Sequence, residues 1–114
     1  MTSQMDRWQA RIQLIKQNLL DLGPMRPGAL SEQYNVCGKP NCKCKDPSRP
    51  QKHGPYFQLS YVHEGKSTTE HVTRDMLDVV REQLTNYATY KKLTCEWVDL
   101  SIQIAKLQRK QSRS

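Results

Sequence analysis

Three cysteines and a histidine are grouped in one proline-rich segment of the chain. Cys37, Cys42 and Cys44 lie within the eight residues CGKPNCKC, and His53 follows nine positions after the last cysteine, in KHGPY. The stretch from Gly23 to Gly54 is rich in proline and glycine and shows no helical periodicity. A loop of about thirty residues rarely stays unordered inside a compact domain. The cysteines are therefore expected to order this segment, and their chemistry constrains the fold.

The spacing of these four residues is suited to zinc. Zinc prefers four ligands in a tetrahedral arrangement, with thiolate and imidazole favoured. The pattern Cys-x4-Cys-x-Cys-x8-His supplies a full set from one loop. A closed set of four protein ligands leaves no position for a water molecule, so a structural role is expected. We predict a zinc-finger-like site with Cys37, Cys42, Cys44 and His53 as ligands.

Other interpretations of the cysteines remain open. A disulfide between Cys42 and Cys44 would close a strained ring, and a reducing cytoplasm disfavours it. An iron–sulfur cluster would need a fourth thiolate, for which Cys95 remains. A catalytic Cys–His pair would need an orienting partner and a substrate pocket, and neither can be read from the sequence. His63 or His71 could also serve as the fourth zinc ligand.

The charge of the chain favours an acidic partner. Of 114 residues, 18 are Lys or Arg and 11 are Asp or Glu, which gives a net charge of +7 at pH 7. Three thiolates and one Zn²⁺ together carry one negative charge, so a single cation near the site would offset it. Five basic residues lie between residues 37 and 53, against Asp46 alone. A solvated basic loop is one explanation. We predict instead a nucleic-acid-binding surface, with DNA favoured over RNA, formed by Lys39, Lys43, Lys45, Arg49 and Lys52.

Two heptad patterns of equal length lie near the two ends of the chain. The first predicts a helix over residues 3–22, with Ser3 as its N-cap and apolar residues at Met5, Trp8, Ile12, Ile15, Leu19 and Leu22. The second runs from Tyr90 to Leu107, inside a helical region over residues 73–108 that Thr73 is expected to cap. The heptad phase slips between residues 87 and 93, where a bend or a break is expected. We predict that the two helices pack antiparallel. A homodimer or a partner helix bound through the same coiled-coil seams is the alternative.

Two β-prone runs, YFQLSYVH and KSTTEHV, flank Glu64-Gly65. An X-Gly pair between such runs predicts a β-hairpin, here over residues 56–72. The pairing then sets His63 opposite Lys66 and Phe57 opposite Val72. One face is expected to enter the core through Phe57, Leu59, Tyr61 and Val72. The other face is a hydrogen-bonding surface of Gln58, Ser60, Val62, Ser67, Thr69 and His71.

The sequence shows no segment suited to targeting or to membrane insertion. The N-terminal MTSQMDRW contains an early acidic residue, and no run of 18 apolar residues follows anywhere. We therefore expect a cytoplasmic α+β protein without membrane contact. Its expected organisation is one domain, with a zinc-binding loop over residues 23–55 and a basic tail over residues 109–114.

The stretch RPGALSEQYNVCGKPNCKCKDPSRPQKHGPYFQLSYVHEGKSTTEHV resembles a small prokaryotic domain family of unknown function. Members of that family share R-P-G-S-L-S-E-Q-Y-x-x-C-G-K-P-x-C-x-C-K-D, then H-G-P-Y-Y-Q-L-S-Y and a G-[KR]-S hairpin. The similarity continues through NYATYKKLTCEWVDLSIQIAKL and covers residues 26–107. Family members are often encoded near mobile elements and transposases. The resemblance implies metal binding by the motif residues Cys37, Cys42, Cys44 and His53.

Together these patterns favour a binding protein over an enzyme. The sequence contains no recognisable nucleophile–base pair, paired carboxylates or phosphate-binding loop. The leading hypothesis is a zinc-binding, nucleic-acid-binding accessory protein that takes part in DNA transactions or belongs to mobile elements. The alternative is a protein-interaction adaptor, in which the heptad helices bind a partner and zinc only shapes the loop.

Overall fold

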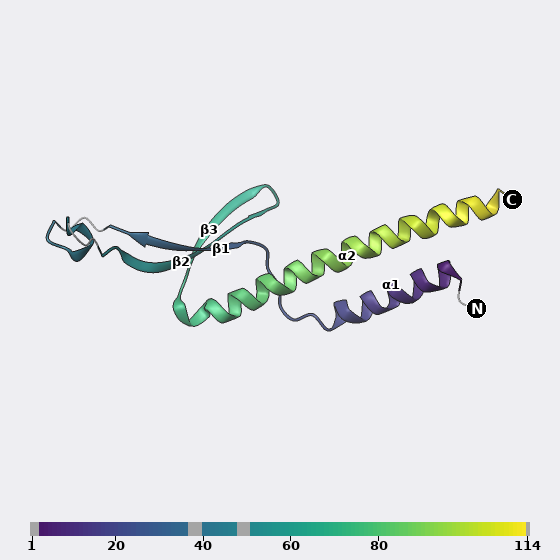
Figure 1. Cartoon of the computed structure of the whole chain (residues 1–114), viewed down its shortest axis with the longest axis horizontal. Coiled ribbons are helices and arrows are strands. Elements are labelled where there is room, and N and C mark those ends of the chain that lie inside the picture. The colour runs from purple at the N-terminus through teal and green to yellow at the C-terminus, as the bar shows by residue number, and fades with distance from the viewer. Residues whose placement is uncertain (1–2, 37–39, 48–50, 114) are drawn as a thin grey trace. The chain divides into compact units, whose positions relative to one another are not determined.

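A computed structural model describes residues 3–36, 40–47 and 51–113 of the chain. The α+β fold class is confirmed. In chain order, the elements are α1 (Gln4–Leu20), β1 (Ala29–Asn35), the 3-10 turn η1 (Lys43–Lys45), β2 (His53–His63), β3 (Lys66–Val72), the 3-10 turn η2 (Arg74–Met76) and α2 (Leu77–Ser112) (Figure 1). Among the described residues, no helix is both long enough and apolar enough to cross a membrane.

The chain divides into two units, and the boundary falls within α2. The helical unit comprises residues 1–25 and 85–114, and the sheet unit comprises residues 26–84. Each unit buries its own set of apolar side chains, as described below.

In the helical unit, α1 begins with the capping box that its sequence allows. Asp6 N donates to Ser3 Oγ at 3.1 Å, and Ser3 N donates to Asp6 Oδ2 at 3.4 Å, so two backbone donors at the helix start are satisfied. The helix ends at Leu20, just before Gly23-Pro24.

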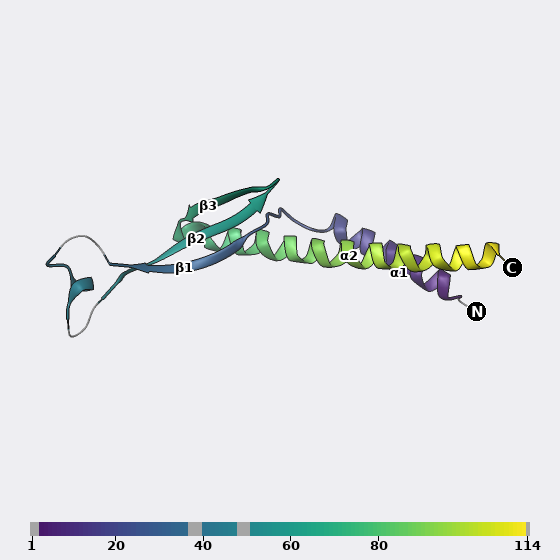
Figure 2. The ribbon, with the colours of Figure 1, turned by 90° about the horizontal axis from the view of Figure 1, so that it is seen from above.

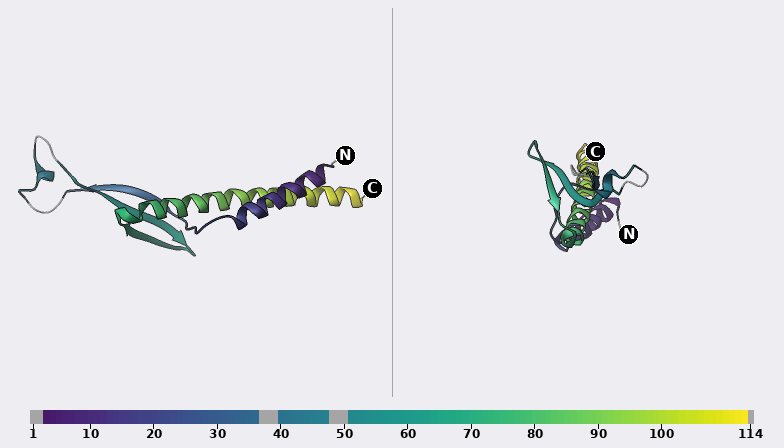
Figure 3. Two further views of the ribbon diagram at one scale, coloured as in Figure 1. Left: turned by 90° about the horizontal axis from the view of Figure 1, so that it is seen from below. Right: turned by 90° about the vertical axis from the view of Figure 1, so that its left-hand side faces the viewer.

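The two helices of this unit run antiparallel, as predicted. Ile12 and Ile15 of α1 are buried, as is Leu93 of α2. Arg11 of α1 bonds to Glu96, while the side chain of Asn86, ten positions earlier in α2, donates to Pro24 O at 2.8 Å. Residues later in the N-terminal segment therefore contact residues earlier in α2, as expected for antiparallel packing. Figures 1 and 3 show α1 beside the C-terminal part of α2.

Of the bend or break expected between residues 87 and 93, the break does not occur, since α2 is continuous from Leu77 to Ser112 and extends into the expected tail. The phase slip of its apolar row follows a change of packing partner. Leu77 and Val80, before the slip, pack in the sheet unit. Leu93, after the slip, is buried in the helical unit. One helix thus contributes to two cores, and its apolar row changes phase a few residues after the unit boundary between residues 84 and 85.

The sheet unit is built on the predicted hairpin. β2 and β3 pair with His63 opposite Lys66 and Phe57 opposite Val72, so the predicted register is confirmed. Glu64 and Gly65 have φ values of 51° and 78°, the left-handed pair of a type I′ turn. This turn matches the twist of the flanking strands and fixes which side chains share a face.

A third strand, β1, lies inside the segment that the sequence predicted to be loop. β1 pairs antiparallel with β2, giving the order β1-β2-β3. Most of its residues are exposed, as on an edge strand, and the segment ALSEQYN lacks a regular alternation of apolar and polar residues. β2 also begins at His53, before the expected start at residue 56. β1 and the first part of β2 continue beyond β3 as a two-stranded ribbon (Figure 2).

The first turns of α2 cover one face of this sheet. Thr73 precedes η2 as expected, although its side chain makes no capping bond. The buried cluster consists of Leu59, Val72, Leu77 and Val80, with Leu30, Phe57, Tyr61 and Leu84 packed against it. The predicted core face of the hairpin is therefore confirmed.

In each unit an arginine forms a hydrogen-bonded ion pair with a glutamate. In the helical unit, Arg11 donates to both carboxylate oxygens of Glu96, at 2.6 and 2.9 Å, and these hydrogen bonds lower the pKa of Glu96. In the sheet unit, Glu70 accepts from Arg26 at 3.1 Å and from the hydroxyl of Tyr61 at 3.0 Å, and these two bonds lower the pKa of Glu70.

Candidate metal centre

The loop between β1 and β2 is closed at its base by the strand ladder. Asn35 lies opposite His53, and the register shifts between Gln33 and Asn35. Gly54, the next residue, has a φ of 141°, and a Cβ there would lie 2.7 Å from Gln33 O and 2.9 Å from Tyr34 Cδ1. Only glycine therefore lets the two strands approach this closely beside His53.

A 3-10 turn ties the two arms of the loop together. Within η1, Lys45 N donates to Cys42 O at 3.0 Å, and Asp46 N donates to Lys43 O at 3.2 Å. Gln51 N, from the returning arm, also donates to Lys43 O at 2.9 Å. These backbone bonds hold the cysteine arm next to the arm that leads into β2.

Three side chains converge within this loop. The ligand atoms of Cys42, Cys44 and His53 all lie within 4.8 Å of one another, and Cys42 Sγ is 2.9 Å from His53 Nε2. Tetrahedral zinc, with Zn–S of about 2.3 Å and Zn–N of about 2.0 Å, places neighbouring donors roughly 3.5–3.8 Å apart. These residues, here called the Cys2His group, therefore lie close enough to bind one metal ion.

Among the described residues, Cys44 is buried without being part of the apolar cluster of the sheet unit. Cys44 is only 2% exposed, while Cys42 and His53 are half-buried. The apolar cluster of the sheet unit does not include Cys44, and the other described loop residues, 40, 41, 43, 45–47, 51 and 52, are exposed. A buried thiol in such a loop is typical of a small segment held by a metal.

Three of the four predicted ligands are thus together, and Cys37 lies outside the described residues. Among residues 3–36, 40–47 and 51–113, the Cys2His group is the only set of three or more His, Cys, Asp or Glu side chains arranged to hold a metal. His63 instead lies 3.7 Å from Glu64 at the hairpin turn, and His71 is exposed on β3. Cys95 is exposed on α2.

The basic loop residues that the structure describes are exposed. Lys43 and Lys45 flank Cys44 in η1, Lys52 precedes His53, and all three are exposed. Lys39 and Arg49, the other two residues of the predicted surface, lie outside the described residues. The cations that the structure describes are therefore interleaved with the metal-ligand candidates.

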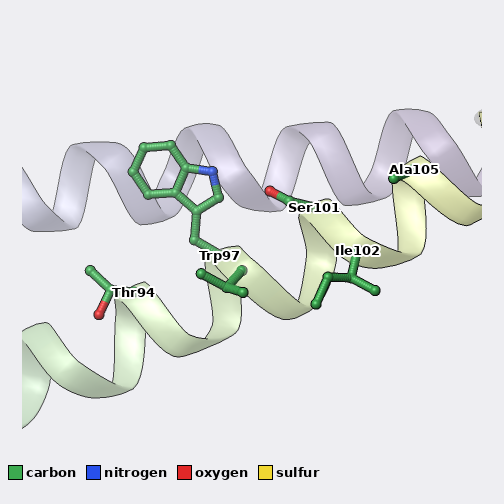
Figure 4. Close-up of a pocket in the computed structure, with 6 residues that line it drawn as sticks. Thr94, Trp97, Ser101, Ile102 and Ala105 are labelled. Atoms are coloured by element: carbon green, nitrogen blue, oxygen red, sulfur yellow. The ribbon is translucent and has the colours of Figure 1, made fainter.

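A second surface feature, in the helical unit, was not predicted from the sequence. An apolar groove of about 430 Å³ runs along α2, and Val98 and Ile102 within it are 56% and 46% exposed. In the sequence, the groove is indicated only by a second row of small and apolar residues beside the main heptad seam. The groove is lined by Thr94, Trp97, Val98, Ser101, Ile102 and Ala105 (Figure 4).

Comparison with known families gives a match for most of the chain. Residues 5–82 match the family described as Domain of unknown function (DUF6788). The chain belongs to this family. The DUF6788 match takes in α1, all three strands and the Cys2His group, which confirms the resemblance to a small family of unknown function. No curated protein and no solved structure matches the chain.

Proposed function

We propose that the chain is a non-enzymatic zinc-binding protein whose metal-ordered loop binds nucleic acid, with DNA favoured over RNA. Its expected role is that of an accessory factor in DNA transactions, including those of mobile elements. One observation carries the proposal, namely that exposed Lys43, Lys45 and Lys52 are interleaved with the Cys2His group in a loop whose described residues lie outside the apolar cluster of the sheet unit.

The donor set fits a structural zinc. Thiolate and imidazole are the ligands that zinc prefers, and Cys37 would complete a closed set of four with the Cys2His group. A closed site leaves no open position for substrate, so the ion's contribution is to the folding of the loop. Binding energy of this kind would replace the hydrophobic burial that the described loop residues, 40–47 and 51–53, do not share with the apolar cluster of the sheet unit.

An ordered loop presents its lysines as a fixed array. Lysines held at set positions contact several phosphates at once, and each contact releases condensed counterions from the nucleic acid. The net charge of +7 adds general attraction for polyanions. The metal would therefore control binding indirectly, through the positions of the lysines.

Titration of a fluorescent random-sequence duplex at 50 to 200 mM salt tests this proposal. We expect the binding constant to fall steeply as the salt concentration rises. In the triple variant Lys43→Ala, Lys45→Ala, Lys52→Ala the plot of log binding constant against log salt concentration should be shallower, its slope smaller in magnitude by about 3. The matched control replaces three exposed lysines of α2 with the same loss of charge, namely Lys92→Ala, Lys106→Ala and Lys110→Ala. An equal effect of both triple variants, or no binding at low salt, would exclude the loop as the binding surface.

The second candidate function is a protein-interaction adaptor, and the apolar groove on α2 favours it. In that case Val98 and Ile102 would contact a partner helix or a second copy of the chain, and zinc would only shape the loop. Light scattering on wild type and on Val98→Lys separates the cases. A wild-type dimer that Val98→Lys converts to monomer supports the adaptor, whereas a monomer that binds DNA supports the leading proposal.

A further inference from the structure

The sheet has one covered face and one open face. Alternation along a strand and direct cross-strand pairing decide which side chains share a face. Leu59 and Val72 lie on the face covered by α2, and their neighbours in sequence point the opposite way. The open face comprises Ala29, Ser31, Gln33, Tyr56, Gln58, Ser60, Val62, Ser67, Thr69 and His71, of which Ser31 and Gln58 are half-buried and the others exposed.

The chemistry of the open face is that of a hydrogen-bonding surface without negative charge. It carries hydroxyl, amide and imidazole groups, and Ser60 Oγ lies 3.3 Å from Thr69 Oγ1 at its centre. The carboxylates of the strands lie elsewhere. Glu32 is opposite Phe57, and Glu70 is opposite Leu59, so both belong to the covered face. A polyanion can therefore approach the open face without repulsion from these groups.

Cations lie near both ends of the hairpin. Lys66 follows the turn at one end and pairs with His63, so alternation assigns it to the edge of the covered side, and Lys52 precedes β2 at the other end. At Gln58 and Ser60 the sheet has three strands, since each of these residues pairs with both β1 and β3. Three strands about 4.8 Å apart span about 10 Å, which fits the major groove of duplex DNA, about 12 Å wide, but not the minor groove of about 6 Å. The cations would then meet the phosphate backbones that border the groove.

Single-stranded nucleic acid fits this face less well. Proteins bind single strands largely by stacking bases on aromatic rings. Of Phe, Tyr and Trp residues, only Tyr56, opposite Gln33, lies on this side of the described strands, at the end nearest the metal loop, and His71 adds one imidazole opposite Gln58. Around Ser60 and Thr69 the side chains offer hydrogen bonds and two aliphatic contacts, Ala29 and Val62, instead of a series of stacking platforms.

We propose that the open face enters the major groove of duplex DNA and confers a sequence preference, while the loop lysines hold the phosphates. This inference rests on the proposed function and extends it from affinity to specificity. The amide of Gln58 can pair with the edge of adenine, the hydroxyls of Ser60 and Thr69 with several bases, and Val62 can contact a thymine methyl group.

Selection from a random duplex library, followed by titration of the enriched duplex and a scrambled one, tests the inference. We expect an enriched sequence that wild type binds at least tenfold more tightly than the scramble, and a loss of most of that ratio in Gln58→Ala, Thr69→Val. Affinity for the scramble should stay within about twofold, since phosphate contacts persist. The matched control is Thr68→Val, the same change one residue earlier, on the covered face.

The outcome of the binding experiments separates this inference from the proposed function. Binding to duplex DNA without any enriched sequence would overturn this inference and leave the proposed function standing. Tighter binding to the separated DNA strands would do the same. Tighter binding to RNA would overturn both this inference and the preference for DNA in the proposed function. No binding to any nucleic acid would overturn both. Valine keeps the β-branched shape of threonine, so the strand should persist. Thermal melting of each variant checks this, and a variant that melts earlier is replaced by Ser60→Val, whose retained preference would also count against the inference.

Discussion

The two units of this chain differ in where they bury their apolar side chains. The helical unit buries Ile12 and Ile15 of α1 and Leu93 of α2 in a seam of regular spacing. The sheet unit concentrates its apolar cluster where α2 covers the hairpin and leaves the loop between β1 and β2 outside that cluster. Ile15 and Cys44 are both almost fully buried, yet only Ile15 lies in an apolar seam. The candidate functional residues therefore gather where hydrophobic packing ends.

The largest effects should come from the two cores. Ile15→Ala and Leu59→Ala each remove a side chain that is 0% exposed, so each should cost about 2–5 kcal/mol of unfolding free energy. Hydrogen exchange should show the loss of Ile15 mainly in the helical unit and the loss of Leu59 mainly in the sheet unit. If either variant lowers the protection of backbone amides from exchange equally in both units, the two cores unfold as one cooperative structure. That result would contradict the division into two separately stabilised units.

A smaller effect is expected at the base of the loop. Gly54→Ala places a methyl group 2.7 Å from Gln33 O at a φ of 141°, so the ribbon beside His53 must distort. We expect a loss of about 1–3 kcal/mol by chemical denaturation, together with weaker metal binding. Gly65→Ala is the matched control, because it also has a positive φ of 78° but no atom lies within 4 Å of its Cβ. Equal metal affinity in the two variants would show that close packing of β1 on β2 does not position the site.

The smallest expected effect is the pH dependence of the stability that the Arg11–Glu96 pair gives to the helical unit. Hydrogen bonds from Arg11 hold the pKa of Glu96 below its usual 4.5, so the folded state binds that proton less readily than the unfolded state. The stability from this pair is fully present above pH 4.5 and is lost as the pH falls through the lowered pKa. Glu96→Gln should therefore melt earlier than wild type at pH 7, and the difference should shrink as the pH falls below 4.5 through the lowered pKa. A difference in melting temperature that stays constant over this range would contradict the assignment.

The parts of the fold that sequence could predict are those set by local rules. The Glu64-Gly65 turn fixes the hairpin register, and Ser3 with the heptad spacing fixes α1. β1 was not predicted, because an exposed edge strand of mostly polar residues shows no alternation of apolar and polar residues. Its pairing with β2 also depends on residues distant in the sequence. The continuity of α2 also depended on tertiary context, since the phase slip reflects a change of partner rather than a break.

The candidate site shows the same division. The cysteine and histidine spacing predicted which donors converge, because short loops bring close neighbours together. The burial of Cys44 in an otherwise exposed loop and the glycine contact beside His53 depend on how β1 packs on β2. Neither could be inferred without the third strand.

Metal analysis combined with hydrogen exchange on the full chain tests the central claim most directly. We predict stoichiometric zinc in protein purified under reducing conditions, and its loss in Cys42→Ser. Removal of zinc by a chelator should abolish protection in the loop around η1, while α1 and the C-terminal part of α2 keep theirs. If no metal co-purifies or rebinds, and loop protection is the same with and without chelator, the metal does not hold this loop and the account is wrong.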